Sequence, residues 1–424
     1  MIYLLETETQ YNYLLNSGFS ECYCEVIGCF SGNTHHPIVN PISCVYIKPI
    51  VENNKDTQKG YILVIKHSDS PYFLPKRYIT KLLKKFTRVW VRDKKSILHS
   101  FSLNNITQIP HMDIQNTPPI KQNFEYRLKN QPTNYMIPIT KLYEECELNF
   151  EDVKDNIKPL DSYGQFLSDK VSLVFWGIEK SGLKVDKQKF EGYFHPIEND
   201  KVFTQYNLHT MTSRPSNKFN GVNYAALNKE NGCRESFIPS NNRLVEIDVS
   251  AYHPNLICKL IGYKPPTQDI HAHFAELYGV EYKASKELTF KQLYGGVFKE
   301  YEHIEFFKRV KEYIELLWIH FNEEGYIEET ISGKRFIKGK IENPNPQKLF
   351  NYLLQATETS MNCLVLWEVL SILKPYNTKL ILYTYDSILI DLDESEEGVL
   401  EKVNEVFKEY GLLTKMKEGY NYGF

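Results

Sequence analysis

The chain has 424 residues, of which 42% are hydrophobic and 24% charged, and its formal net charge is −3. This length is enough for two or three domains with separate cores, and the charge excludes a protein that is basic throughout. The eight cysteines form no C-x-x-C pair, which argues against structural zinc and for free thiols in a reducing compartment. Neither a secretory signal nor a membrane span is apparent, so we expect a cytoplasmic protein.

Residues 1 to about 165 are expected to form an α/β domain. Runs of apolar and β-branched residues predict four strands, at 22–27, 43–50, 61–65 and 87–91. Residues 75–86 predict a helix. Lysine and arginine are concentrated over residues 76–95, where Asp93 is the only acid. This concentration fits a solvated helix face or a surface that faces DNA, and the sequence alone leaves both open.

The rest of the chain alternates between strands and helices. The patterns predict, in order, a helix at 168–182, strands at 234–238 and 244–249, helices within 266–322, a hairpin at 326–337, a long helix at 346–373, paired strands within 380–391, a helix at 395–410 and a final strand at 412–422. Gly182 and Gly411 suit the ends of helices, and Pro375 cannot continue the long one.

Two of these strand segments carry an aspartate at a strand end. Asp248 ends a buried run, just before the turn and Pro254 that begin a helix, and Asp386 lies in the turn of the paired strands. Such residues suit divalent metals, because Mg²⁺ prefers carboxylates together with substrate phosphates. For Asp248 alone, a helix-capping role is an equally good interpretation.

Between them, Lys286, Phe290 and Tyr294 fall on one side of a predicted helix. One cation and two aromatic faces suit a nucleoside triphosphate, whose phosphates need charge and whose base needs a flat apolar surface. Taken in isolation, an amphipathic helix with an aromatic core stripe is the simpler interpretation.

The order of these segments resembles a known family. Asp248-Val-Ser, Lys286-x3-Phe290-x3-Tyr294-Gly295 and Tyr385-Asp386-Ser387 resemble motifs A, B and C of family A DNA polymerases, the Klenow-fragment type. Four other segments resemble that family's T-G-R-L-S, D-I-H, G-Y-V-x-T-L-x-G-R-R and N-x-P-I-Q-G-T: Thr212–Ser216, Asp269–His271, Gly325–Arg335 and Asn351–Thr357. Each match is weak alone, but seven in one order over residues 212–391 make a specific signal.

The resemblance implies an α+β right-hand polymerase preceded by an α/β ribonuclease-H-like domain of the 3′–5′ exonuclease type. The expected parts are an exonuclease-like domain at 1–165 and a polymerase domain at 166–424, with a thumb remnant at 166–210, a palm at 211–265 and 346–424, and fingers at 266–345. Only Lys187–Met211 stand where the family has a helical thumb. We therefore expect a reduced or absent thumb, and a processivity or accessory protein in its place.

The exonuclease chemistry of that family needs four acidic metal ligands, beginning with D-x-E on the first strand. The matching stretch here, Cys22–Ile27, has Glu25 as its only acid, and Arg92–Leu98 lacks the next expected aspartate. We expect a degenerate domain without proofreading. A grouping of Glu25, Asp93, Asp113 and Asp169 in space would contradict this.

The resemblance further implies a template-directed DNA polymerase, a nucleotidyltransferase that extends a primer with deoxynucleotides and uses two Mg²⁺ ions, or Mn²⁺. The implied catalytic residues are Asp248, Asp386 and Lys286, and the implied metal ligands are Asp248, Asp386 and the Val249 carbonyl. The implied nucleotide-binding residues are His253, His271, Lys286, Phe290 and Tyr294. The implied DNA-binding residues are Arg214, Asn351 and Gln355. Primer-template DNA and deoxynucleoside triphosphates are the expected partners, without a membrane.

Three positions depart from the family pattern. Tyr282 stands where the family has an arginine, although Lys283 is adjacent; His253 stands where a glutamate excludes the ribose 2′-hydroxyl; and Ser387 replaces a second acid. Phosphate affinity and ribonucleotide discrimination are therefore open.

Two other functions remain as alternatives. One is a catalytically silent DNA-binding or scaffolding protein descended from a polymerase, and the other is a single-subunit RNA polymerase of related fold. A reverse transcriptase fits less well, because Asp386 is not followed by a second aspartate. The compact size and the abundance of Tyr, Asn, Ile and Lys suggest a bacteriophage or other virus, whose enzyme would work in the host cytoplasm.

Overall fold

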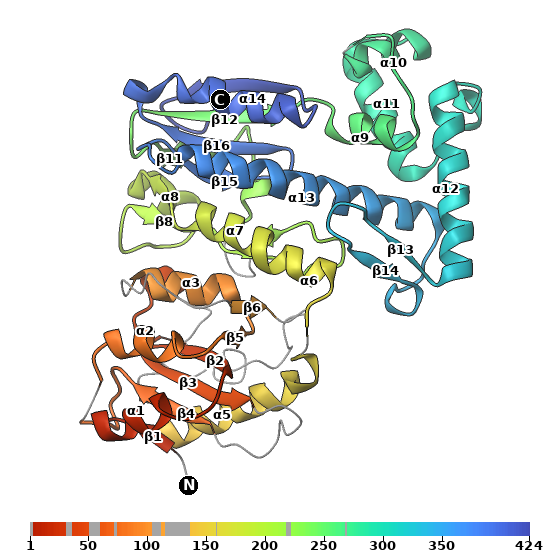
Figure 1. Ribbon diagram of the computed structural model, residues 1–424. Coiled ribbons are helices and arrows are strands. Elements are labelled where there is room, and N and C mark those ends of the chain that lie inside the picture. Colours follow the sequence, from red (N-terminus) through yellow and green to blue (C-terminus); the bar gives the residue numbers. More distant parts are fainter. Residues whose placement is uncertain are drawn as a thin grey trace. The chain divides into compact units, whose positions relative to one another are not determined.

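The computed structural model describes residues 3–30, 36–50, 60–71, 74–103, 112–114, 136–157, 159–217, 222–267 and 269–424. The chain divides into two compact units. The N-terminal unit comprises Met1–Lys180 with Lys218–Gly221, and the C-terminal unit comprises Ser181–Asn217 with Val222–Phe424. Figure 1 shows the elements of each. Among the described helices, none has both the length and the apolar composition that crossing a membrane requires.

A six-stranded mixed sheet forms the centre of the N-terminal unit. Its order is β1-β4-β3-β2-β5-β6, with antiparallel pairing at β2·β3 and β3·β4 and parallel pairing elsewhere. The four predicted strands are confirmed as β2 (Glu21–Gly28), β3 (Ile42–Ile50), β4 (Tyr61–Val64) and β5 (Arg88–Val91). The short edge strands β1 (Tyr3–Leu5) and β6 (Met112–Ile114) were not predicted, because three residues carry too little periodic pattern.

Helices cover both faces of this sheet. The first face packs against α1 (Glu8–Leu15), α2 (Arg77–Leu83) and α3 (Lys94–Leu103), and the second against α5 (Ile139–Val153). Successive strand residues alternate between the two cores, so Cys22 and Cys24 lie in the first and Tyr23 in the second. The unit ends in α6 (Ser162–Phe166), a π-helical turn (Leu167–Val171) and α7 (Ser172–Glu179).

The C-terminal unit is organised around an antiparallel sheet of order β15-β16-β12-β17. Its strands are β15 (Lys379–Tyr383), β16 (Ser387–Leu392), β12 (Arg243–Val249) and β17 (Thr414–Gly419). The paired strands predicted within 380–391 and the final return strand are thereby confirmed. A smaller sheet joins β11 (Phe237–Ile238), β7 (Leu183–Val185) and β8 (Lys201–Val202), and two residues each form β9 (Tyr206–Asn207) and β10 (Ser216–Asn217).

The helices of this unit are α8 (Lys187–Tyr193), α9 (Tyr252–Leu260), α10 (Ile270–Tyr278), α11 (Tyr282–Gly295), α12 (Glu305–Glu324), α13 (Pro346–Leu373) and α14 (Val399–Glu409). Helix α13 has 28 residues, roughly 42 Å at 1.5 Å per residue. Asn345 caps its start, Pro346 occupies its first turn, and the predicted bounds are confirmed. Helix α13 runs from beside the sheet toward α12 and the β13–β14 hairpin (Tyr326–Glu328 and Arg335–Ile337) (Figure 1).

Candidate active site

The fold of the C-terminal unit brings Asp248 and Asp386 to the same end of its main sheet. Strand β12 pairs antiparallel with β16 so that Asp248 lies opposite Ser387, the residue that follows Asp386. The Val249 amide donates to the Asp386 carbonyl at 2.8 Å, which ties the two backbones together at this point. The antiparallel register therefore places two aspartates from distant parts of the sequence beside each other.

Asp248 is half-buried, whereas Asp386 is exposed at the surface although its carboxyl is partly desolvated by its surroundings. The charge of Asp386 repels that of Asp248. Burial, followed by the charges of Asp386 and Glu246, raises the pKa of Asp248 to about 6. Burial also raises the pKa of Asp386, with Glu358 adding to the effect. A divalent cation would relieve this repulsion, and two carboxylates are the oxygen ligands that Mg²⁺ prefers. The residues present thus fit the predicted metal ions, with the Val249 carbonyl as a further predicted ligand.

Unusual backbone conformations surround the two aspartates. Among the described residues, four non-glycine residues have positive φ, and three of them adjoin the site: Ser213 (62°), Ala251 (49°) and Tyr385 (71°). The left-handed region costs a non-glycine residue about 1–3 kcal/mol, so the surrounding structure must hold these turns in place.

A hydrogen-bonded chain from α13 supplies that support. Asn362 donates to the Tyr385 carbonyl at 2.8 Å and to the Tyr383 hydroxyl at 2.9 Å, and it accepts from the Tyr252 hydroxyl at 2.8 Å. Tyr252 is the first residue of α9, which follows the Asp248 turn. One buried amide therefore fixes both aspartate-bearing turns against α13. No local pattern pointed to Asn362, because its partners come from two distant segments, at Tyr252 and at Tyr383–Tyr385.

Helix α11 presents the predicted nucleotide-binding side chains together. The rings of Phe290 and Tyr294 are stacked, with centroids 6.0 Å apart and planes 6° from parallel. His271 on α10 lies 6.1 Å from the Phe290 ring. Burial, and then the Lys286 charge, lowers the pKa of His271 to about 4, so this imidazole is neutral at pH 7.

Tyr282, which stands where an arginine was expected, has a structural role here. Its hydroxyl donates to the Asp269 carboxylate at 3.0 Å, and Asp269 caps α10 by accepting from the His271 and Ala272 amides. The Lys286 ammonium lies 4.7 Å from the centre of the Tyr282 ring. Tyr282 thus joins α11 to the start of α10 and borders the lysine.

Glu358 on α13 joins Arg214 and His253, two residues that the sequence singled out separately. The Arg214 guanidinium contacts both Glu358 oxygens, at 3.0 and 3.2 Å, and lies 4.0 Å from the centre of the Tyr385 ring. The His253 Nε2 atom is 3.5 Å from Glu358 Oε1, and its Nδ1 contacts the Tyr294 hydroxyl. Sequence reasoning missed Glu358. The available signal was an acid within a long helix that has only one other acid, Glu368.

Asn351 and Gln355 lie one turn apart on α13, and Gln355 is in turn one turn before Glu358 and Thr359. Both are half-buried. The structure therefore places the three predicted DNA-binding residues around α13, with Arg214 attached through Glu358. Contact with DNA stays a prediction for all three.

The acids considered for exonuclease chemistry have local partners in the N-terminal unit. Glu25 is buried and accepts from the Asn149 amide at 3.0 Å and from the Tyr23 hydroxyl. Asp93 accepts from the Ser96 amide at 2.9 Å, and Asp169 lies 3.7 Å from the Lys94 ammonium. The side chain of Asp113 lies outside the described residues. No group of three acids forms from these residues within the described part of the chain.

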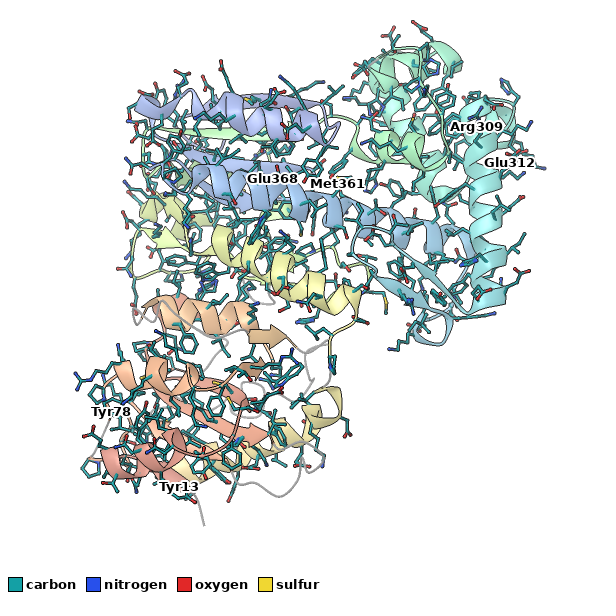
Figure 2. All side chains as sticks on the ribbon, viewed as in Figure 1. Tyr13, Tyr78, Arg309, Glu312, Met361 and Glu368 are labelled. Carbon is teal, nitrogen blue, oxygen red and sulfur yellow. The ribbon has the colours of Figure 1, made fainter. Side chains whose placement is uncertain are left out.

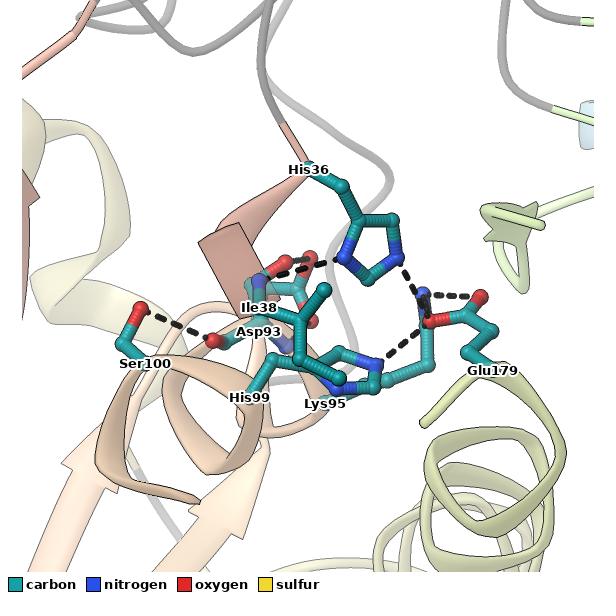
Figure 3. Close-up of polar contacts among 8 residues, drawn as sticks. His36, Ile38, Asp93, Lys95, His99, Ser100 and Glu179 are labelled. Carbon is teal, nitrogen blue, oxygen red and sulfur yellow. Dashed lines mark hydrogen bonds and ion pairs between the residues drawn. The ribbon is translucent and has the colours of Figure 1, made fainter. Parts of the chain in front are cut away.

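A different polar cluster does form in this unit, from His36, His99, Glu179 and Lys95 (Figure 3). The ligand atoms of the two histidines and the glutamate lie within 4.8 Å of one another, a grouping that sequence spacing did not reveal. Lys95, part of the basic run at 76–95, is 3% exposed and contacts the Glu179 oxygens at 2.7 and 2.9 Å. Lys95 is therefore not part of a surface that faces DNA.

Hydrogen bonding favours a buried ion pair over a metal site at this cluster. His36 Nδ1 accepts from the Ile38 amide at 3.1 Å, which leaves the ring proton on Nε2, the atom that faces Glu179. His99 Nε2 lies 2.7 Å from Glu179, and burial lowers the pKa of His99 to about 4. Two imidazoles and one ammonium thus surround the carboxylate, and the charges of Lys95 and Glu179 cancel.

Comparisons with known proteins bear on the fold. No protein-family model and no curated protein matches the chain. Among solved structures, the chain is similar to the POL domain of Pol1 from M. smegmatis in complex with DNA primer-template and dNTP, with a TM-score of 0.71 and 12% identity, over 100% of this chain and 99% of that one. The fold is that of a polymerase domain. At 12% identity the similarity shows the fold alone.

The charge balance at Glu179 leads to a stability prediction. Glu179→Gln leaves the buried Lys95 ammonium uncompensated, which should lower the free energy of unfolding by about 3–5 kcal/mol. Urea unfolding measures the loss. The control is Glu151→Gln, which breaks the exposed pair with Lys154 and should cost less than about 1 kcal/mol. Similar losses in the two variants would contradict a buried ion pair.

The raised pKa of Asp248 leads to a second prediction. Protons compete with cations for this carboxyl, so the apparent Mg²⁺ affinity of the DNA-free protein should fall as the pH drops through about 6. Each pH unit below that value should weaken binding by about tenfold. Calorimetric titration with MgCl₂ from about pH 8 to pH 5 measures this, beside Asp248→Asn, which should bind Mg²⁺ more weakly and keep only the pH dependence that Asp386 contributes. A constant affinity across the range would contradict a metal role for Asp248.

Proposed function

We propose that the chain is a template-directed DNA polymerase that adds deoxynucleotides to a primer 3′ end by two-metal phosphoryl transfer. The observation that carries the proposal is the pairing of Asp248 with Asp386, in a chain with the fold of a polymerase domain. The His253–Tyr294 contact joins this aspartate site to α11, which carries the predicted nucleotide-binding face. The similar M. smegmatis protein holds DNA primer-template and dNTP.

In this proposal Asp248 and Asp386, with the Val249 carbonyl, hold two Mg²⁺ ions, and Mn²⁺ would fit the same oxygen ligands. When bound, such ions lower the pKa of the primer 3′-hydroxyl and neutralise charge on the leaving pyrophosphate. The carboxylates position the ions, and they must be unprotonated to do so. Their repulsion in the absence of a cation supports this assignment.

The remaining residues bind and orient the substrates. Lys286 supplies a point charge to the triphosphate, while the neutral His271 donates a hydrogen bond without adding charge. The stacked Phe290 and Tyr294 rings offer a flat surface to the new base pair. Arg214, Asn351 and Gln355 reach minor-groove acceptors, which are nearly the same for every base pair and so test its shape.

The parts of a right-hand polymerase are assigned within the same proposal. Residues 211–265 and 346–424 form the palm, 266–345 the fingers, and 166–210 a thumb remnant. Within 187–211, which the structure describes in full, the helix is α8 of seven residues, and this supports a reduced thumb. An accessory protein would then supply grip on the duplex.

Residues 1–165 are proposed to be a degenerate exonuclease-like domain without proofreading. Support comes from Glu25, Asp93 and Asp169, each of which interacts with a neighbouring side chain or amide of the protein. Mismatched primer ends should therefore not be shortened by this chain.

Primer extension tests the proposed activity. Losing a carboxylate ligand removes several kcal/mol of transition-state stabilisation, so Asp248→Ala and Asp386→Ala should each slow extension by roughly 10³-fold or more. The matched control is Glu312→Ala, an exposed acid on α12 (Figure 2), which should keep wild-type rates. The assay uses a short DNA primer-template, Mg²⁺ and deoxynucleotides.

The same assay separates the alternatives. Preferential use of ribonucleotides by the wild type would identify an RNA polymerase of related fold. No extension at high protein concentration, with or without host extract, would favour a silent scaffold. Extension that appears only with extract would indicate that a partner replaces the thumb.

A further inference from the structure

Glu358 is a buried acid at the junction of three elements that carry predicted substrate contacts. It is 1% exposed, lies on α13, and contacts Arg214 and, through His253, the hydroxyl of Tyr294 on α11. We propose that Glu358 is a positioning residue for sugar discrimination, which fixes the His253 ring as the wall against a ribose 2′-hydroxyl. This inference rests on the proposed polymerase function.

The buried negative charge of Glu358 needs a nearby cation, and Arg214 supplies one on one side of the carboxylate. Taking a carboxylate out of water costs several kcal/mol unless a cation and hydrogen bonds replace the solvent. Arg214 meets both oxygens side-on, at 3.0 Å from Nε and 3.2 Å from Nη2. Because Arg214 also lies over the Tyr385 ring, the carboxylate is fixed relative to the turn that holds Asp386.

The second side of Glu358 faces His253. This ring is 6% exposed, and each of its nitrogens meets one polar group: Nε2 lies 3.5 Å from Glu358 Oε1, and Nδ1 contacts the Tyr294 hydroxyl. The Tyr294 hydroxyl fixes one edge of the ring by a hydrogen bond, and the Glu358 carboxylate lies within ion-pair distance of the other edge, so a turn of the ring would lose both contacts. Glu358 and Tyr294 therefore set the orientation of His253 together.

The position of His253 identifies the part of the substrate that it meets. In the proposed complex, the triphosphate lies at Lys286 and His271, and the base lies against Phe290 and Tyr294. The sugar then lies between the end of α11 and Asp248, where the contact of His253 with Tyr294 places its ring. A rigid ring there excludes an added hydroxyl by steric conflict, whereas a mobile ring makes room for it.

The test compares deoxy- and ribonucleotides in primer extension. The readout is the ratio of kcat/KM for a deoxynucleotide to that for the matching ribonucleotide. Glu358→Gln keeps the side-chain size but removes the charge that faces His253 Nε2, and the ratio is expected to fall by about tenfold. Glu368→Gln is the control, since Glu368 is on the same helix (Figure 2), accepts from the Tyr410 hydroxyl at 2.6 Å, and should leave the ratio at the wild-type value.

A double-mutant cycle shows whether Glu358 acts through His253. His253→Ala should lower the ratio by itself, and adding Glu358→Gln should then lower it no further. An unchanged ratio in Glu358→Gln overturns the proposal. A further tenfold fall in the His253→Ala background also overturns it, because Glu358 would then act by another route.

A second pair of variants and a spectroscopic measurement test the proposal if Glu358→Gln does not fold or if no primer is extended. If Glu358→Gln does not fold, the pair Glu358→Leu with Arg214→Leu leaves no buried ion. The ratio should fall in that pair as well, and an unchanged ratio overturns the proposal. Nitrogen-15 spectra of His253 in the substrate-free protein should shift between wild type and Glu358→Gln, and identical spectra overturn the contact. A wild type that does not extend primers contradicts the polymerase function itself, which the spectra do not depend on.

Discussion

The repulsion between Asp248 and Asp386 is the constraint on which the C-terminal unit depends. At this end of the sheet, burial and the charge of Asp386 raise the pKa of Asp248, and this costs folding free energy while no cation is present. The backbone bond from Val249 to Asp386 and the Asn362 hydrogen bonds hold the two turns in place against that cost. Such stored repulsion is what a metal site needs, because the cation then gains the full attraction of both carboxylates without rearranging them.

Two other buried acids, Glu179 and Glu358, are stabilised by cations that lie beside them. Glu179 is surrounded by donors and paired with Lys95, so the cluster is neutral and faces no substrate. Glu358 is paired on one side with Arg214, and its other side lies beside the His253 ring at the edge of the proposed sugar pocket. The first arrangement stabilises the N-terminal unit. The second leaves a charge able to act on a neighbouring side chain, which is why the further inference concerns Glu358.

The pattern of apolar, capping and helix-breaking residues was enough to predict most helices and strands, as single elements show. Helix α13 has a cap at Asn345, Pro346 in its first turn and Pro375 beyond its end, so its bounds follow from backbone chemistry. Strands β2 to β5 have enough apolar residues to bury both faces. The short strands β1 and β6 were missed, because their pairing with longer neighbours determines them more than their own residues do.

The sequence by itself determined which residue types stand at strand ends and on one side of α11, and the order of these segments indicated a polymerase. Those features depend only on neighbouring residues or on the order of segments along the chain, so they can be identified from one sequence. Tertiary structure alone decided which groups meet. The antiparallel register of β12 and β16 put Asp248 beside Asp386, and the packing of α13 put Glu358 between Arg214 and His253. Such contacts join residues far apart in the chain, and neither periodicity nor spacing encodes them, because they depend on how whole elements pack.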